Sequence, residues 1–332
     1  MGADTVSLES QYEESTWEHG RLYQKFAVEK SIYWVPIDEE EEERQNIEDD
    51  VLNGVFNNKL FFSDPPHNPN KVLDLGYGQA HWAITVAETY PDCEVTAIDI
   101  RPLDLPVYPP NLSLECDNLN NILTDVYPQD SFDIIQSRLV GPGIHKNRWP
   151  SYLAELRQLL APTGTLQACE YYFNIQSHAG LLTPDSALTR WGTLYRRAME
   201  RLQRDPRMGN HLLPLCRSAG FAPLQVKYYE LPIGSWPSDE RQRQIGARML
   251  ENMDLMLESF GLWGLVKVLE MTVEEVKKLA DDCRLEFKRE EIKPYLPCSV
   301  VWGGKGLEGS AAGSASADAG LDSATTSGDE TA

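Results

Sequence analysis

VLDLGYGQAHWA (residues 72–83) runs from an apolar segment through a turn of small residues into the start of a helix. Gly76 and Gly78 lack a Cβ, so the backbone there can turn tightly and approach a ligand closely. In an open parallel sheet, ligands bind beyond the carboxyl ends of the strands, where the strand order reverses. The stretch therefore predicts the first strand of an α/β sheet followed by a cofactor loop, with an ordinary turn as the alternative.

The spacing of the small residues separates two nucleotide cofactors. A dinucleotide loop, G-x-G-x-x-G, needs a third glycine at position 81, where this chain has His81. Enzymes that use S-adenosylmethionine space their small residues as G-x-G-x-G, which places the third at Ala80. The loop therefore favours S-adenosylmethionine and disfavours an NAD-dependent oxidoreductase.

The rest of the chain alternates short apolar segments with helical ones. This alternation predicts a mainly parallel, Rossmann-like sheet covered by helices on both faces. The expected strands are 71–75, 93–100, 112–116, 132–137, 164–173, 223–234 and 295–304. The expected helices are 38–57, 80–90, 149–160, a helical stretch over 187–219, 239–262 and 272–288.

Polar residues at the ends of successive expected strands support a cofactor site, although each alone could simply cap a loop. Asp99 ends the second strand, where a carboxylate can accept hydrogen bonds from ribose hydroxyls. Asp117 ends the third strand, where its carboxylate suits an adenine amino group and the Asn118 N–H suits a ring nitrogen. The predicted cofactor-binding residues are Asp74, Gly76, Tyr77, Gly78, Asp99, Ile100, Asp117, Asn118, Ser137 and Arg138.

Composition limits the function classes. The net charge of −21 argues against a general affinity for nucleic acid or an anionic membrane. No apolar run is long enough to span a bilayer, and the N-terminus lacks the pattern of a signal peptide. Six cysteines are scattered without metal-site spacing, so we expect no metal, and a location in the cytoplasm or the nucleus.

The chain resembles the class I S-adenosylmethionine-dependent methyltransferases, in particular the fungal LaeA-like, velvet-associated group. The resemblance covers residues 20–304 and is carried by YWVPIDEEEEERQNI, VLDLGYGQAHWAI, AIDIRPLDLPVYPPNLSLECDN, FDIIQSRLV, WPSYLAELRQLLAPTGTLQACEYY and EEIKPYLPCSVVWGGK. It implies a seven-stranded sheet whose last strand is antiparallel. It also implies methyl transfer to a small secondary metabolite or a protein, with velvet-domain proteins or a sister methyltransferase as partners.

Two departures from the family pattern affect the expected site. The loop reads Tyr77-Gly78-Gln79-Ala80 where the family usually has Cys-Gly-Thr-Gly, and Asn118 replaces a frequent aspartate. Tyr77 is expected either to lie over the methionine part of the cofactor or to block it. A regulatory subunit that keeps the fold and acts by binding partners is therefore the second hypothesis.

The expected acceptor site lies near the strand ends. His145, Glu170 and Tyr171 are the candidate catalytic residues, with Arg138 available to orient an acidic acceptor; His145 has an alternative role as a loop histidine bonded to backbone. Trp191, Tyr195 and Met199 have helical spacing and are expected either to line the acceptor pocket or to belong to the core.

The expected organisation has three parts. They are a flexible arm (1–20), a methyltransferase domain (21–304) and a disordered tail (305–332). Within the domain we expect an N-terminal helical cap (21–60), a core (70–175), a helical lid inserted before the penultimate strand (187–219), and C-terminal strands and helices (222–304).

Overall fold

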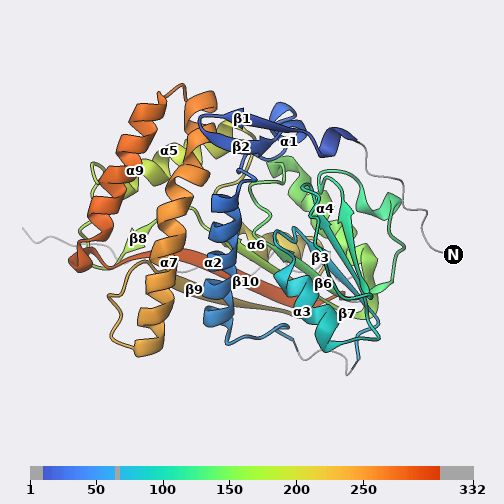
Figure 1. Ribbon diagram of the computed structural model, residues 1–332. Coiled ribbons are helices and arrows are strands. Elements are labelled where there is room, and N and C mark those ends of the chain that lie inside the picture. The colour runs from blue at the N-terminus through green and yellow to red at the C-terminus, as the bar shows by residue number, and fades with distance from the viewer. Residues whose placement is uncertain (1–9, 64–67, 307–332) are drawn as a thin grey trace, which may run out of the picture.

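The computed structural model describes residues 10–63 and 68–306 (Figure 1). The predictions for residues 1–9 and 307–332 lie outside the described residues. The strands are β1 (Ser15–Glu18), β2 (Arg21–Gln24), β3 (Lys71–Leu75), β4 (Glu94–Asp99), β5 (Leu112–Cys116), β6 (Phe132–Arg138), β7 (Leu160–Tyr171), β8 (Gln176–Ser177), β9 (Leu224–Pro232) and β10 (Pro294–Gly304). The α-helices are α1 (Lys25–Glu29), α2 (Glu39–Phe56), α3 (His81–Thr89), α4 (Trp149–Leu159), α5 (Ala187–Arg201), α6 (Met208–Ser218), α7 (Glu240–Ser259), α8 (Gly261–Trp263) and α9 (Val273–Phe287). The remaining helical turns are η1 (Ser10–Tyr12), η2 (Leu123–Asp125), η3 (Lys146–Arg148), η4 (Gly264–Val268) and η5 (Glu290–Ile292).

The main sheet has the predicted architecture. Its strand order is β5-β4-β3-β6-β7-β10, and β8 and β9 both pair with β10. The pairs β4–β5, β3–β4, β3–β6 and β6–β7 are parallel, whereas β10 is antiparallel to both β7 and β9. The Rossmann-like sheet with its antiparallel last strand is therefore confirmed, with the two-residue β8 as an addition.

Strand order reverses at β3, because β4 lies on one side of it and β6 on the other. This is the position where an open parallel sheet leaves a crevice at its carboxyl edge. The glycine loop follows β3 directly, so the reversal sets the loop beside the ends of β4 and β6. The fold thus brings together residues that are separated by up to about sixty positions in the sequence.

Alternation along each strand divides the apolar core between the two faces of the sheet. On one face, Leu73, Leu166 and Ala168 pack against α4 and α6. On the other face, α3 covers the β3–β5 side around Val72 and Val95. A larger cluster under α2, α5, α7 and α9 covers β7 and β10 on that second face. Helices therefore shield both faces of the sheet, as Figure 1 shows.

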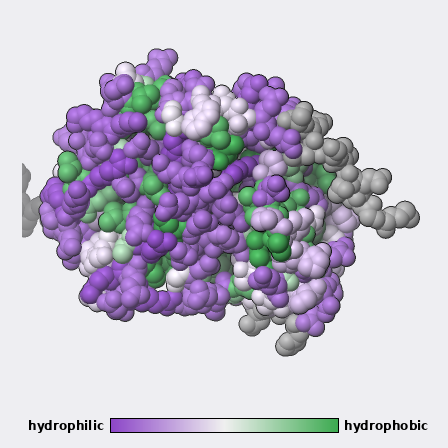
Figure 2. All heavy atoms as spheres, in the orientation of Figure 1, coloured by the Kyte–Doolittle hydropathy of each residue, from purple (hydrophilic) through white to green (hydrophobic). Residues whose placement is uncertain are grey.

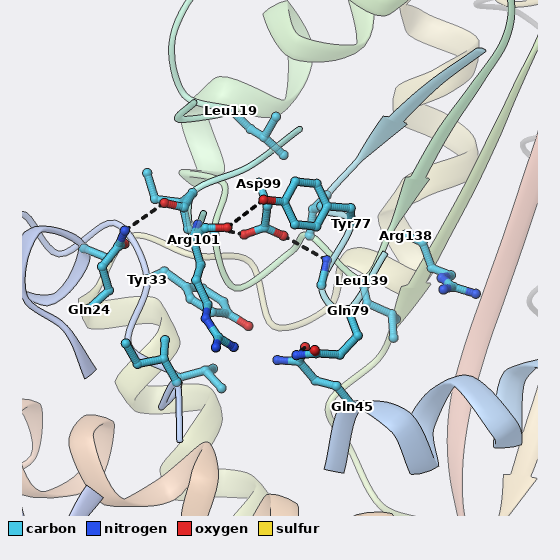
Figure 3. A pocket seen from close by; sticks show the side chains of 18 of the residues that line it. Gln24, Tyr33, Gln45, Tyr77, Gln79, Asp99, Arg101, Leu119, Arg138 and Leu139 are labelled. Atoms are coloured by element: carbon cyan, nitrogen blue, oxygen red, sulfur yellow. Dashed lines mark hydrogen bonds between the residues drawn. The ribbon is translucent and has the colours of Figure 1, made fainter. Parts of the chain in front are cut away.

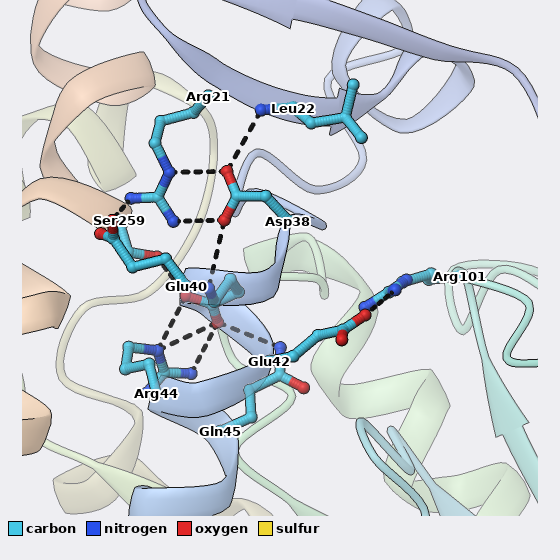
Figure 4. Close-up of polar contacts among 10 residues, drawn as sticks. Arg21, Leu22, Asp38, Glu40, Glu42, Arg44, Gln45, Arg101 and Ser259 are labelled. Carbon is cyan, nitrogen blue, oxygen red and sulfur yellow. Dashed lines mark hydrogen bonds and ion pairs between the residues drawn. The ribbon is translucent and has the colours of Figure 1, made fainter.

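A hairpin joins the end of the predicted arm (1–20) to the predicted cap (21–60). Residues 15–18 do not form a free arm, because β1 pairs with β2 in an antiparallel hairpin. Arg21 fastens this hairpin to the start of α2: its Nη2 lies 2.6 Å from Asp38 Oδ1, and its Nη1 lies 2.9 Å from Glu40 Oε1 (Figure 4). Asp38 also accepts the Glu41 N–H at 3.1 Å as the N-cap of α2.

A buried polar cluster joins α2 to α7. The Arg44 guanidinium pairs with Glu41, with Nη2 2.8 Å from Oε1, and it donates to Asn252 Oδ1 at 3.0 Å. Ser259 donates a hydrogen bond to the same glutamate (Figure 4). A buried charge without a partner is costly, so these contacts fix α2 in one position over the sheet.

The structure contradicts the prediction that residues 187–219 form a lid. Trp191, Tyr195 and Met199 of α5 are buried in the core cluster with Phe173 and Phe260, and α5 packs on α9. The Trp191 ring stacks on Tyr195 with centroids 5.2 Å apart. The alternative that these residues belong to the core is therefore the correct one, because the apolar side of α5 is consumed by helix packing.

The described residues show two general features of the chain. Among them, no helix combines the length and apolar character needed to cross a membrane. The face drawn in Figure 2 carries mainly hydrophilic side chains, in keeping with the net charge of −21.

Candidate active site

A cavity of about 150 Å³ lies beyond the carboxyl ends of the strands and under the cap. We call it the strand-end cavity. Its sheet side is lined by Gly76, Tyr77, Gly78, Gln79, His81, Asp99, Ile100, Arg101, Asp117, Asn118, Leu119, Arg138, Leu139, Val140 and Gly143. Its cap side is lined by Gln24, Ala27, Ile32, Tyr33, Val35, Pro36, Ile37, Arg44, Gln45, Glu48, Asp49 and Leu52.

The glycine loop reaches the cavity through left-handed backbone conformations. Gly76 has a φ of +79° and Gly78 a φ of +55°, values that favour glycine. A Cβ on Gly76 would lie 2.4 Å from Val140 Cγ1, so no side chain fits there. Ala80, in the third small position, has a φ of +59° and is the N-cap of α3. The loop thus presents backbone to the cavity, as a closely held ligand requires.

Asp99 fixes the loop and faces the cavity at the end of β4. Its Oδ2 accepts the Gly78 N–H at 3.0 Å and its Oδ1 accepts the Arg101 N–H at 3.0 Å (Figure 3). Burial raises the pKa of this carboxyl, while the bonds from the Arg101 and Gly78 N–H groups oppose the rise. A carboxylate has about four lone-pair positions, so two remain for ligand hydroxyls.

Tyr77 neither blocks the cavity nor crosses to its Arg138 end. Its hydroxyl donates to the Arg101 carbonyl at 2.8 Å, and only 5% of the residue is exposed. The ring packs in the core cluster that contains Trp82. The tyrosine therefore ties the glycine loop to the segment after β4, beside Asp99 (Figure 3).

The end of β5 contributes a small acidic turn. Asp117 and Asn118 both line the cavity, together with Leu119. Asp117 Oδ1 accepts the Asn118 N–H at 2.6 Å and the Asn121 side chain at 2.9 Å. The Asn118 N–H expected to meet a ring nitrogen is therefore taken up by Asp117 in this structure.

The end of β6 meets α2 through an ion pair. Arg138 Nη2 lies 2.8 Å from Asp49 Oδ1, and His81 Nδ1 lies 3.6 Å from Asp49 Oδ2. Hydrogen bonding to Asp49 raises the pKa of His81, although its partial burial opposes the rise. Asp49 and the rest of α2 were not among the predicted site residues. The acidic run 38–57 was the signal in the sequence, but nothing in it indicates which of its carboxylates turns inward.

Two predicted cofactor residues lie behind the cavity wall. Asp74 is buried in β3 and accepts from Gln136 Nε2 at 3.3 Å; its burial raises the pKa to about 7. The Ser137 hydroxyl lies 2.9 Å from the Tyr152 hydroxyl. Both residues support the strands without lining the cavity, whereas the other eight predicted cofactor residues line it.

Glu170 and Tyr171 do not reach the cavity. Glu170 accepts the Val140 and Gly141 N–H groups at 2.9 and 3.1 Å, and burial raises its pKa to about 8. The strand pleat sets it on the same side as Ala168, away from the cap. The Tyr171 hydroxyl donates to Glu48 at 3.1 Å from the opposite side. Glu170 holds the loop after β6, and Tyr171 acts on the cavity only through Glu48.

His145 also lies outside the cavity. The buried Arg204 donates from Nη1 to His145 Nδ1, 2.7 Å away, because a guanidinium has no acceptor. The imidazole therefore carries its proton on Nε2, and burial followed by the Arg204 charge lowers its pKa. The backbone N–H of His145 donates to Asn120 Oδ1 at 2.9 Å. His145 is thus held in its loop, but its ring bonds to the Arg204 side chain and not, as the alternative role had it, to backbone.

The lining charges suit a cationic ligand with a diol. Four carboxylates line the cavity, and the three arginines there are each paired with an acid; the carboxylates are Glu48, Asp49, Asp99 and Asp117. The Asp99 carboxylate beside the two glycines of the loop matches a ribose next to a sulfonium. Within residues 10–63 and 68–306, no group of three or more His, Cys, Asp or Glu could hold a metal ion.

Comparison with known proteins agrees with this geometry. Residues 72–164, from β3 to the start of β7, match the methyltransferase domain family. The chain carries a methyltransferase domain. The cofactor of such a domain is S-adenosylmethionine, as the G-x-G-x-G spacing predicted.

Two kinds of fungal relatives align with most of the chain. The chain is 27% identical to the methyltransferase pytC of Aspergillus terreus over 297 residues, which are 89% of this chain and 90% of that protein. It is 26% identical to the secondary metabolism regulator laeA of Aspergillus fumigatus, over 84% of this chain and 73% of that one. The secondary metabolism regulator laeA of Gibberella zeae is 27% identical, over 87% of this chain and 92% of that protein. The resemblance to the LaeA-like methyltransferases is confirmed.

Solved structures are more distant. The Haemonchus contortus phosphoethanolamine N-methyltransferase 2 in complex with S-adenosyl-L-methionine superposes with a TM-score of 0.46 at 14% identity. The alignment covers 77% of this chain and 53% of that protein. The YcgJ protein of Bacillus subtilis gives a TM-score of 0.42 at 16% identity, over 75% of this chain and 96% of that one.

Proposed function

We propose that the methyltransferase domain binds S-adenosylmethionine in the strand-end cavity and transfers its methyl group to an acceptor that enters beside the cap. The observation that carries the proposal is Asp99, a half-buried strand-end carboxylate that holds the glycine loop and also lines the cavity. The adenosine would lie across Ile100 and Leu119, and Asp117 would meet the adenine amino group. The amino-acid part of the cofactor would lie toward Arg138.

The protein's contribution to such a reaction is orientation and exclusion of water. Methyl transfer from a sulfonium is an in-line displacement, so a dry pocket that aligns the acceptor supplies most of the acceleration. Leu52 and Leu139 give the cavity apolar walls between α2 and β6. The cap closes it, because Gln24 Nε2 donates to the Ile100 carbonyl at 2.9 Å and Arg101 pairs with Glu42 at 2.5 Å.

Calorimetric titration with S-adenosylhomocysteine tests the cofactor site. We expect one binding site per chain, and about a 100-fold loss of affinity in Asp99→Ala, since two charge-assisted hydrogen bonds disappear. Asp104→Ala is the control, because Asp104 is exposed on the same connection. Wild-type protein without binding heat, or an Asp99→Ala variant with unchanged affinity, would rule out the proposed site.

A role in secondary metabolism is part of the proposal and is supported by the names of the relatives. A location in the cytoplasm or the nucleus is proposed from the scattered cysteines of the sequence alone. The names of the secondary metabolism regulators favour a second candidate, a regulatory subunit that acts by binding partners. Velvet-domain proteins or a sister methyltransferase are the partners that the resemblance to the LaeA-like group implies. Incubation of the protein, its partner and radiolabelled S-adenosylmethionine separates the candidates. Label in an organic-soluble product supports metabolite methylation, and label in a protein band supports modification of a partner. A partner retained equally by Asp99→Ala, with no label in either fraction, supports the binding role.

A further inference from the structure

Every arginine that lines the strand-end cavity is already paired with a carboxylate. Arg44 Nη1 lies 3.0 Å from Glu48 Oε1, and Arg138 pairs with Asp49 at 2.8 Å. Arg101 pairs with Glu42 at 2.5 Å. Among the described lining residues there is no lysine. An anionic acceptor would therefore have to break an existing ion pair in order to find a cation.

Tyr33 and Glu48, on the cap side, line the cavity with bonding capacity left, as does the Gln24 side-chain oxygen. Tyr33 points into the cavity (Figure 3), and its hydroxyl has no hydrogen-bond partner within residues 10–63 and 68–306. Glu48 Oε1 accepts from Arg44 and from the Tyr171 hydroxyl, at 3.0 and 3.1 Å. Over the same part of the chain, Glu48 Oε2 accepts no hydrogen bond.

These contacts leave Glu48 oriented and its second oxygen available. The Glu48 side chain is 13% exposed, and two donors on one of its oxygens fix its direction. A largely desolvated polar atom without a partner is costly unless a ligand meets it. Apolar side chains line the same cavity, among them Ile32, Val35 and Leu139. The subsite therefore fits a small apolar group that carries one hydrogen-bond donor.

We infer that the acceptor presents an amine N–H or a hydroxyl O–H to Glu48 Oε2, beside Tyr33, and is not recognised through a carboxylate or phosphate. The inference rests on the proposed function and narrows its substrate class. It also replaces the expectation that Arg138 orients an acidic acceptor. The Tyr33 hydroxyl would meet the same heteroatom from the other side.

The chemistry balances with these groups. The acceptor nitrogen or oxygen forms a bond to the methyl carbon, and the bond from that carbon to sulfur breaks with its electron pair left on sulfur. The acceptor proton passes to Glu48 Oε2. The products are the methylated acceptor, S-adenosylhomocysteine and a protonated Glu48, which then loses its proton to water.

Matched fragments test the subsite in protein saturated with S-adenosylhomocysteine. Benzylamine, phenol and benzoate share one ring and differ in the group offered to Glu48. Saturation-transfer NMR should show binding of benzylamine and phenol and none of benzoate. In Glu48→Gln, benzylamine binding should weaken at least about tenfold, because the amide keeps the contacts to Oε1 and loses the acceptor at the second position. Glu43→Gln is the control, since Glu43 is exposed on the same helix.

Each outcome bears on the inference separately from the proposed function. Benzoate that binds as well as benzylamine would overturn it, as would benzylamine binding that is equal in Glu48→Gln and Glu43→Gln. S-adenosylhomocysteine binding to all three proteins without any bound fragment would overturn the acceptor class and leave the cofactor site standing. Failure of the wild type to bind S-adenosylhomocysteine would instead remove the proposed function, and this inference with it.

Discussion

Single residues at the strand ends set the shape of the cavity. Gly76 turns the chain directly after β3, and its missing side chain makes room for Val140. Asp99 accepts the N–H groups of Gly78, in the loop, and of Arg101, in the segment after β4. Tyr77 fills the space beside them and bonds to the Arg101 carbonyl. These contacts hold the loop in place, and the unusual tyrosine is one of the residues that make them.

Gly76→Ala should destabilise the fold through Val140. A Cβ at a φ of +79° is strained, and it would meet Val140 Cγ1 at 2.4 Å. We expect a loss of about 2 kcal/mol in the free energy of unfolding. Val140→Ala removes the clashing methyl, so the double variant should lose at least about 0.5 kcal/mol less than the sum of the single losses. Urea unfolding measures all three, and strict additivity would show that the contact is unimportant.

Glu170 should make stability depend on pH. In the folded protein its pKa is about 8, against 4.5 ordinarily, so between these values the folded state keeps a proton that the unfolded state has released. Its contribution to stability is complete below about pH 4.5 and is lost as the pH rises toward about 8. Urea unfolding should show that the wild-type advantage over Glu170→Gln shrinks across this range. A difference that grows with pH would contradict the assignment.

The sequence predicts which residues end neighbouring strands. It does not predict the direction in which their side chains point. Asp99 and Asp117 were expected at the site because each ends a strand next to β3 or β4. Glu170 also ends a strand, but the pleat turns it toward the loop after β6. Tyr33 and Glu48 precede the sheet in sequence, so only the folding of the cap over the strand ends reveals them.

At the scale of elements, the cap and the α5–α9 layer divide two tasks. α2 closes the cavity and is held to α7 through the buried Arg44 cluster. α5 packs its apolar side into the core and contributes no residue to the cavity lining. The sequence pattern of α5 is equally compatible with a lid and with a core helix, because an amphipathic period reports burial and not the partner.

Trp191→Phe tests whether α5 is core or lid. The Trp191 Nε1–H donates to the Leu257 carbonyl at 3.1 Å, and the residue is 2% exposed. We expect the free energy of unfolding to fall by about 2 kcal/mol and the S-adenosylhomocysteine affinity to stay within about twofold. Arg197→Ala, on the exposed side of α5, should change stability by less than about 0.5 kcal/mol. Unchanged stability with weakened binding would restore the lid assignment.

At the scale of the whole molecule, the cofactor site joins parts that are distant in sequence. The sheet supplies the strand ends, and the cap supplies the opposite wall. The fold class followed from the strand and helix alternation, since a parallel sheet needs helical crossovers. The β1–β2 hairpin did not, because two four-residue strands around His19 and Gly20 give too short a pattern to stand out.

Equilibrium dialysis with radiolabelled S-adenosylmethionine tests the central claim most directly. We predict that one molecule is retained per chain, that S-adenosylhomocysteine displaces it, and that NAD⁺ does not, because His81 occupies the third glycine position of a dinucleotide loop. Absence of retained label, or displacement by NAD⁺, would contradict the assignment of the strand-end cavity to a sulfonium cofactor.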